Sequence, residues 1–346
     1  MKDGGSVGVD RTCSGIVKVS QSRIRNWRTC KRQHHYKYVE NIKPKRVKRP
    51  FQFGRIVHSM VEAYANADDP FEVLDGIQMD KKAMFRAEEE MYGNIIEDIR
   101  AIMTEYFEHW PEDSFVYLRR GGRSAEFKFE IELEPGIVFS GIIDAAAKAR
   151  KMKWLVEHKS FKRKPNDDER WRNVQACVYM RANDMLGWFK GVEGMAWDYI
   201  KSIPPKDPVI LQSGKVSAAA KSLTLPAKAI QYFEANDIPV ETEGVAEFLK
   251  ACEAERAEYF SRIFMPVSRT VVDDVWDDFL VSAREVAELG DTRKERNIGR
   301  HCSWCDYEPL CRAAMQGSDV DFIKEREYIA RDTEEHEAYG NEAEEG

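Results

Sequence analysis

The sequence predicts a mixed α/β (α+β) fold, because segments with strand periodicity lie between segments with helical periodicity. Residues 126–133 (EFKFEIEL) alternate polar and apolar side chains, and residues 137–149 and 151–161 continue a three-strand antiparallel pattern with hairpin-like breaks. Apolar residues recur with a helical period before this pattern, at residues 70–110, and after it, at residues 169–186. A chain of 346 residues is long enough for about two domains, or for one large domain with insertions.

The N-terminal part is expected to be largely helical. A Gly-rich, flexible leader at residues 1–18 precedes a helical region, residues 19–110, whose first helix has Ser20 or Ser22 as its N-cap. A further helix follows a basic, proline-containing loop, and it places His58 and Glu62 one turn apart on a face separate from its apolar stripe.

The C-terminal half alternates strands, loops and helices. Residues 111–204 are the expected core, residues 205–225 a loop or arm, residues 226–315 a helical part, and residues 316–346 an acidic, disordered tail. The elements expected after the core sequence 126–186 are a strand at 191–202, helices at 227–235, 243–257 and 270–290, a strand at 258–268, and the cysteine segment 302–311 as the last ordered element.

Composition excludes several classes of protein. The chain is 43% hydrophobic, yet no apolar run approaches the roughly 18 residues that span a bilayer, so we expect no membrane association. The first residues lack a basic region followed by an apolar one, which makes a secretory signal unexpected and a cytoplasmic location the default. Seven cysteines, three of them within ten residues, indicate metal or cluster ligation over disulfides.

Charge is strongly segregated along the chain. The seven acidic residues of 332–346 account for the whole net charge of −7, whereas residues 23–55 carry twelve Lys and Arg against one acid. Aromatic residues are interleaved with this basic block, which favours a surface for nucleic-acid phosphates over a merely solvated face. Residues 148–172 form a second basic stretch. The candidate DNA-binding residues in these stretches are Arg46, Lys48, Arg49, Lys162, Arg163 and Lys164.

Two carboxylates and a lysine are expected to converge at the ends of neighbouring strands. Asp144 closes the sequence GIID, and Glu157 and Lys159 share one face of the next strand because strand side chains alternate. Such a set suits Mg²⁺ or Mn²⁺ and a lysine that orients a water for attack on a phosphodiester. Solvated charges at strand ends are the simpler alternative, but both carboxylates follow apolar and therefore buried strand residues.

The cysteine segment predicts a second site. Cys302, Cys305 and Cys311 supply three thiolates, which are too few for a closed four-coordinate site, so a fourth ligand has to come from elsewhere in the chain. Zinc and an iron-sulfur cluster are both compatible with this spacing, and His301 is an alternative ligand. The remaining cysteines, Cys13, Cys177 and Cys252, are expected to be buried or free thiols.

The order of four short motifs resembles the RecB-type branch of the PD-(D/E)XK nucleases. The motifs are GRIVH at 54–58, GIID at 141–144, EHK at 157–159 and QACVY at 175–179. The resemblance implies a restriction-endonuclease-like core with a central mixed sheet flanked by helices.

The same resemblance implies roles for individual residues. It makes His58, Asp144 and Glu157 metal ligands together with the backbone carbonyl of His158, and it makes Lys159 the catalytic lysine. Gln175 and Tyr179 would face the site from a helix and hold the strand and the lysine. Glu62 would support the ligands from a second layer, and Ser160 replaces a more usual threonine while keeping the hydroxyl.

The segment WRTCKRQHHYKY resembles the N-terminal segment of RecB-type nucleases that carry an iron-sulfur cluster, including CRISPR-associated ones and the AddB subunit of recombination nucleases. This implies that Cys30 joins Cys302, Cys305 and Cys311 in holding a 4Fe-4S cluster, with Zn²⁺ as the alternative. The site would staple the two ends of the chain to the core.

Together these features predict a Mg²⁺- or Mn²⁺-dependent deoxyribonuclease, an exonuclease that takes DNA ends or single strands in recombination, repair or phage replication. The alternatives are a CRISPR-adaptation-type DNA end-processing nuclease and an inactive, cluster-stapled DNA-binding module. The chain has no G-x-x-x-x-G-K-[ST] motif, so any translocation has to come from a helicase, recombinase or integrase partner.

Overall fold

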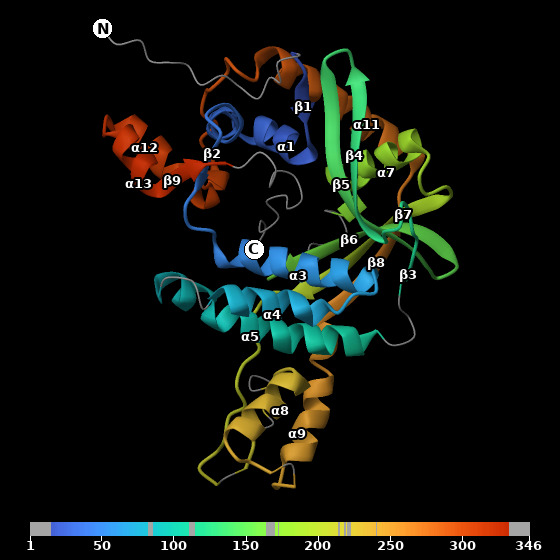
Figure 1. Ribbon diagram of the computed structural model, residues 1–346, viewed down its shortest axis with the longest axis vertical. Coiled ribbons are helices and arrows are strands. Elements are labelled where there is room, and N and C mark those ends of the chain that lie inside the picture. The colour runs from blue at the N-terminus through green and yellow to red at the C-terminus, as the bar shows by residue number, and fades with distance from the viewer. Residues whose placement is uncertain are drawn as a thin grey trace.

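The structure is a computed structural model in which a central sheet lies between layers of helices (Figure 1). It describes residues 15–81, 86–110, 115–163, 170–171, 173–213, 215–217, 219, 223–239 and 241–331. In this part of the chain no helix is both long enough and apolar enough to cross a membrane.

The sheet has seven strands in the described residues and is mixed, as predicted. Its order is β1-β5-β6-β7-β8, with β3 and β4 also pairing with β5. Strands β4, β5 and β6 form the expected antiparallel pattern, whereas β1 runs parallel to β5, β7 parallel to β6 and β8 antiparallel to β7. The strands are β1 (Val17–Val19), β3 (Val116–Tyr117), β4 (Ala125–Glu134), β5 (Ile137–Ala149), β6 (Met152–Phe161), β7 (Val192–Lys201) and β8 (Phe260–Pro266).

One hydrophobic core joins this sheet to helices α1 (Gln21–Thr29), α7 (Val174–Leu186) and α11 (Arg269–Leu289). Ser20 and Asn173 cap α1 and α7 by accepting hydrogen bonds from main-chain N–H groups in the first turn. Gly187, in the left-handed region at φ 63°, ends α7. Large side chains from helix and sheet fill this core, among them Trp27, Phe139, Trp197, Trp276 and Phe279.

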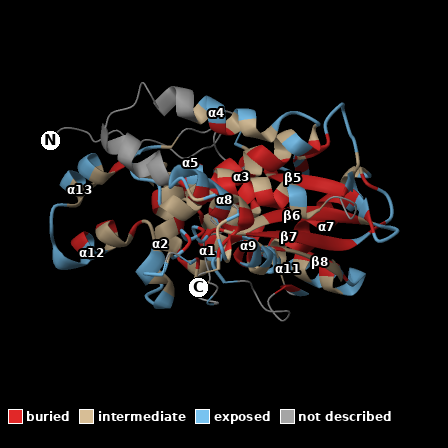
Figure 2. Cartoon of the chain, turned by 90° about the horizontal axis from the view of Figure 1, so that it is seen from below, coloured by how far each residue is buried: buried red, intermediate tan, exposed pale blue. Residues whose placement is uncertain are grey.

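A second core lies under helices α3 (Arg49–Ala65), α4 (Pro70–Lys81) and α5 (Arg86–His109). Ile200 of β7 and Phe260 of β8 belong to it, so these helices also pack on the sheet. In the view of Figure 2 the strands are almost continuously buried, while the outer faces of the helices are exposed. Helix α3 thereby brings residues 49–65 against β6, where the candidate chemistry lies.

Two smaller units complete the described fold. Helices α8 (Pro226–Ala235) and α9 (Val245–Glu253) enclose their own core with Val216, at the lower end of Figure 1, and α10 (Arg256–Tyr259) leads back into β8. At the left of Figure 1, residues from the N-terminal and C-terminal parts of the described chain pack together around Tyr36, Tyr307 and Tyr328. This terminal lobe contains α2 (Lys31–His34), a π-helical turn His35–Val39, β2 (Ile42–Pro44), a 3-10 turn Arg300–Trp304, α12 (Glu308–Gln316), α13 (Val320–Glu327) and β9 (Tyr328–Ala330).

The structure corrects several expected boundaries. Val17 and Lys18 belong to a strand paired with β5, so the leader ends earlier than residue 18. Ordered structure does not stop at the cysteine segment, because α13 and β9 follow it and β9 pairs with β2. The expected helix 243–257 is split between α9 and α10. Most of the proposed leader and the acidic residues 332–346 lie outside the described residues.

Candidate active site and cysteine cavity

The register of two antiparallel strands brings Asp144 and Glu157 together. Ala145 of β5 pairs with Val156 of β6, so Asp144 and Glu157 are opposed at the next position. Both carboxylates are buried, with exposed fractions of 6% and 3%. The structure therefore places these two predicted residues in one site inside the sheet.

Lys159, Glu157 and Gln175 form a closed triangle of polar contacts. The Lys159 Nζ donates to Glu157 Oε1 at 2.6 Å and to Gln175 Oε1 at 3.2 Å, and Gln175 Nε2 donates to the same Glu157 oxygen at 2.9 Å. Tyr179 lies one helical turn further along α7, buried edge-on against the ring of Phe129. Burial, followed by the charge of Glu157, raises the pKa of Tyr179, which keeps its hydroxyl protonated.

His58 reaches the site from helix α3. Its Nε2 lies 2.8 Å from the carbonyl oxygen of His158, and its Nδ1 lies 3.7 Å from Asp144 Oδ2. The main-chain N–H of His158 donates to the same Asp144 oxygen at 2.9 Å. Burial, reinforced by the His158 ring, lowers the pKa of His58 to about 4, so the imidazole is neutral at pH 7 and can act as a metal ligand.

The glycines of two motifs allow these elements to approach closely. A Cβ on Gly54 would lie 3.2 Å from Ser160 Oγ, so α3 packs onto the end of β6 at this position. A Cβ on Gly141 would lie 2.7 Å from the ring of Phe129 and 3.3 Å from that of Tyr179. A side chain at position 141 would therefore require the Phe129 ring to move, whereas at position 54 a small shift of the Ser160 hydroxyl would be enough.

Glu126 is a member of the site that the sequence reasoning did not identify. Ala125 pairs with Ala145 and Phe127 with Ile143, which puts Glu126 opposite Asp144. Ligand atoms of His58, Glu126 and Asp144 all lie within 4.8 Å of one another. The sequence signal that could identify Glu126 is the register of the hairpin, because a turn at Gly136 puts residue 126 opposite Asp144. The polar-apolar alternation of β4 alone assigns Glu126 to the exposed face.

The electrostatics of the site fit a hard divalent cation. Burial raises the pKa of Asp144 and of Glu157, and burial together with the charge of Asp144 raises the pKa of Glu126 to about 9. The second carboxylate oxygen of Glu157, Oε2, is buried and has no hydrogen-bond partner among the described residues. Clustered, desolvated carboxylates beside a neutral imidazole are a donor set that Mg²⁺ or Mn²⁺ would stabilise.

Glu62, the expected supporting residue, is held at the edge of this cluster. Arg123 Nη2 donates to Glu62 Oε1 at 2.5 Å, and the charge of Glu62 contributes to the raised pKa of Glu126. The charge of Arg123 acts in the opposite direction and lowers the pKa of Glu126, so the two charges of this pair partly offset each other at Glu126.

Cysteines from both ends of the chain line one cavity. Cys30 lies at the C-terminal end of α1, and Cys302, Cys305 and Cys311 lie in the 3-10 turn, directly after it and in α12. All line a cavity of about 270 Å³, and burial raises the pKa of Cys305 to about 12 and that of Cys311 as well. Cys177 and Cys252 are buried elsewhere, and Cys13 lies outside the described residues.

The candidate DNA-binding residues are only partly available at the surface. Lys48 forms an ion pair with Asp306 at 2.7 Å, and Arg49 forms one with Asp98 at 2.5 Å. Both side chains therefore already have an acidic partner within the fold. Arg46 is exposed in the loop before α3. Lys162 and Arg163 are exposed after β6, and Lys164 lies outside the described residues.

The chain matches a known protein-family model. A family model described as the PD-(D/E)XK nuclease superfamily matches residues 18–312. That range contains the residues of the carboxylate site and the four cysteines of the cavity. A search of curated proteins finds no match to the chain.

Proposed function

Because the chain belongs to the PD-(D/E)XK nuclease superfamily and is thereby a metal-dependent nuclease, we propose that it is a deoxyribonuclease that degrades DNA from its ends. The observation that carries the proposal is the contact of Lys159 with Glu157 and Gln175. The second oxygen of Glu157 is buried and has no hydrogen-bond partner in the part of the chain that the structure describes. The Lys159 ammonium is held 2.6 Å from the Glu157 carboxylate, where it can take part in hydrolysis. Burial of this ion pair costs desolvation free energy, so a purely structural role would be unfavourable.

The residues that would hold Mg²⁺ or Mn²⁺ are His58, Asp144 and Glu157, with the His158 carbonyl and Glu126 as further oxygen donors. When bound, the cation supplies a Lewis acid for the phosphodiester and a water of lowered pKa.

The protein groups have separate tasks in this reaction. The Lys159 ammonium orients the attacking water and offsets the negative charge that develops on the phosphorane-like transition state. Gln175 holds Lys159 and Glu157 in register from α7, and it keeps the ammonium from turning toward solvent. His58 stays neutral, because burial holds the pKa of its imidazole to about 4, and it can donate a lone pair throughout the reaction.

The cysteine cavity supports a second, structural group in this proposal. Cys30, Cys302, Cys305 and Cys311 would hold a 4Fe-4S cluster, with Zn²⁺ as the alternative. The raised thiol pKa values of Cys305 and Cys311 mean that a positively charged centre has to displace their protons. The group would fasten α1 to α12 and thereby fix the terminal lobe on the nuclease core.

The biological setting rests on the resemblance of the motif order alone. We place the protein in the cytoplasm, acting in DNA recombination, repair or phage replication with a helicase, recombinase or integrase as partner. Trimming of DNA ends in CRISPR adaptation would use the same site. The tight Lys159–Glu157 contact argues against an inactive DNA-binding module, since binding alone would not require it.

An assay with matched linear and circular DNA tests the proposal. Linear single- and double-stranded substrates labelled at one end, and circles of the same sequence, are incubated with Mg²⁺, Mn²⁺ or EDTA. We expect linear DNA to be shortened with either metal, circles to persist and EDTA to stop the reaction. Cleavage of circles would overturn the exonuclease assignment. Failure to cleave any DNA with either metal would overturn the deoxyribonuclease assignment.

A further inference from the structure

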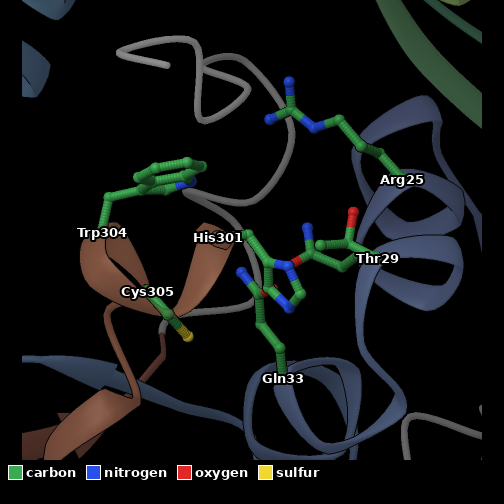
Figure 3. A pocket seen from close by; sticks show the side chains of 7 residues that line it. Arg25, Thr29, Gln33, His301, Trp304 and Cys305 are labelled. Carbon is green, nitrogen blue, oxygen red and sulfur yellow. The ribbon is translucent and has the colours of Figure 1, made fainter. Parts of the chain in front are cut away.

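A small pocket lies between helix α1 and the 3-10 turn Arg300–Trp304, beside the cysteine cavity (Figure 3). We call it the Trp304 pocket. In Figure 3, Trp304 and Arg25 stand on opposite sides, and His301 and Gln33 lie between them. Its enclosed space is only about 20 Å³, so a ligand would lie across its mouth on the surrounding side chains. The lining residues are Arg25, Asn26, Thr29, Gln33, His301, Trp304 and Cys305.

The lining combines an exposed aromatic face with unsatisfied polar atoms. The side chain of Trp304 is 45% exposed, although tryptophan is usually well buried. Asn26 is 3% exposed. Two buried polar atoms of the lining, Asn26 Oδ1 and His301 Nε2, have no hydrogen-bond partner among the described residues. Because unpaired buried polar atoms are unfavourable, the pocket is complementary to a flat ligand that also offers polar groups.

The lining favours a negatively charged ligand. Arg25 supplies a guanidinium at the edge of the pocket, opposite Trp304. A nucleotide has both required features, a planar base and an anionic phosphate. Aromatic platforms beside basic side chains are how proteins hold single-stranded nucleic acids without reading their sequence.

The pocket is connected to the candidate active site through helix α3. Lys48, the N-cap residue of α3, donates from Nζ to the main-chain oxygen of Trp304 at 3.1 Å. His58 lies ten residues further along the same helix, which is about 15 Å along the helix axis. A strand held at Trp304 would therefore lie beside the N-terminal end of the helix that carries His58.

We propose that the Trp304 pocket binds one unstacked nucleotide of a single-stranded DNA substrate. The base stacks on the indole of Trp304, its phosphate faces Arg25, and the strand continues toward Asp144 and Glu157. The inference rests on the proposed deoxyribonuclease function, and it adds that the DNA bound at this pocket is single-stranded. Bases in a duplex are stacked on their neighbours and offer no free face to the indole.

Strand binding in EDTA tests the pocket without cleavage. The probe is a fluorescently labelled oligomer of about ten thymidines, and fluorescence anisotropy gives its Kd for the full-length protein. We expect Trp304→Ala to raise the Kd roughly 5- to 150-fold, the ratio that corresponds to losing one base–aromatic stack, and Trp304→Phe to retain most of the affinity. Phe322→Ala is the matched control, because Phe322 is an aromatic residue on α13 with 57% of its side chain exposed. It should bind as wild type.

Two further probes separate stacking from charge. An abasic oligomer with the same number of phosphates should bind wild type and Trp304→Ala equally well. Arg25→Gln should lower the slope of log Kd against log salt by about 0.7 for the thymidine oligomer, as expected for one lost phosphate contact. Thermal unfolding of each variant checks that the fold is retained.

Three outcomes would overturn the inference: unchanged binding by a folded Trp304→Ala variant, an equal loss for the abasic oligomer, or an equal dependence on Trp304 with duplex DNA. An equal dependence with a uridine RNA oligomer would overturn its restriction to DNA. The proposed function fails separately, because it fails when DNA is not cleaved with Mg²⁺ or Mn²⁺, whatever the anisotropy shows.

Discussion

The ring Nδ1 of His158 lies 3.1 Å from the Asp198 carboxylate, on the face of β6 away from Glu157 and Lys159. Asp198 is fully buried, and the Tyr106 hydroxyl donates to the same oxygen, Oδ2, that lies against His158. The other oxygen, Oδ1, accepts from Arg262 Nε at 3.2 Å. These partners outweigh burial and lower the pKa of Asp198 to about 2. His158 therefore connects a buried ionic network to the main-chain groups that contact His58 and Asp144.

Removing the anion of this network is predicted to be strongly destabilising. Asp198→Ala would leave the buried guanidinium of Arg262 without its counter-charge, so the free energy of unfolding should fall by about 3–5 kcal/mol in urea titrations. Asp273→Ala is the matched control, because the ion pair of Asp273 with Arg181 is largely exposed and should contribute at most about 1 kcal/mol. Equal effects of the two changes would contradict the network's role.

The catalytic lysine can be tested against an exposed lysine of the same sheet. Lys159→Ala removes the ammonium that contacts Glu157 and should lower kcat by at least about 100-fold without loss of the fold. Lys128→Ala changes an exposed lysine on β4 and should leave kcat within about twofold, which single-turnover cleavage at saturating DNA would measure. Near-normal turnover in Lys159→Ala would remove this residue from the reaction.

Glu126 is expected to act through metal affinity. Its carboxylate lies within 4.8 Å of ligand atoms of His58 and Asp144, so Glu126→Gln should raise the Mn²⁺ concentration for half-maximal cleavage by about 10- to 100-fold. At saturating Mn²⁺ the rate should largely recover. Glu130→Gln alters the exposed partner of Lys18 on the same strand and should not shift the Mn²⁺ titration. A matching shift in both variants would speak against a specific role.

The cysteine cavity makes a prediction about metal content. Protein purified without oxygen should contain about four irons per chain and absorb visible light, and Cys30→Ser should lose both together with stability. Cys252→Ala, which changes a buried cysteine of the α8–α9 core, should keep its iron. Elemental analysis that finds one zinc and no iron would favour the alternative metal.

His34 is predicted to make the terminal lobe sensitive to acid. Burial, with the charge of Arg23 next, lowers the pKa of His34 to about 2, from about 6.5 in an unfolded chain. Below pH 6.5 the unfolded state takes up a proton that the folded state does not, so this residue reduces stability as the pH falls from 6.5 toward 2.

The substitution His34→Gln keeps an acceptor for Arg23 Nε, which donates to the ring at 3.2 Å. Urea midpoints at pH 7 and pH 5 should differ less in this variant than in wild type, with a limit of about 1.4 kcal/mol per pH unit. An unchanged difference would mean that His34 does not control the acid response.

The parts of the fold that depend on local pattern could be predicted from sequence, and those that depend on distant partners could not. The polar-apolar alternation of residues 126–161 was sufficient to predict the antiparallel strands. The order of the motifs was sufficient to predict that Asp144, Glu157 and Lys159 share one site. The pairing of β9 with β2 could not be foreseen, because three-residue strands carry almost no periodicity.

The same limit applies to the candidate site, where the sequence did not show the partners of individual residues. Glu126 alternates with apolar residues and so resembles a solvated strand position, but its backbone adopts φ 54° and it faces Asp144 across the hairpin. Charge counting assigned Lys48 and Arg49 to DNA, although the acids that pair with them, Asp306 and Asp98, are distant in sequence. Local composition shows how many charges a segment has, and only the fold shows which are already used.

The pairing of β2 with β9 also has a consequence for biosynthesis. Ile42–Pro44 leave the ribosome long before Tyr328–Ala330 exist, and at typical rates of elongation the interval is roughly 15–60 s. During this interval Cys30 and the aromatic residues around Tyr36 lack the C-terminal residues that they contact in the folded protein. The β4–β5 hairpin, by contrast, can form as it emerges from the ribosome. The terminal lobe is therefore the last part of the described fold to assemble, and any metal it holds has to be delivered after the segment with Cys302, Cys305 and Cys311 has been made.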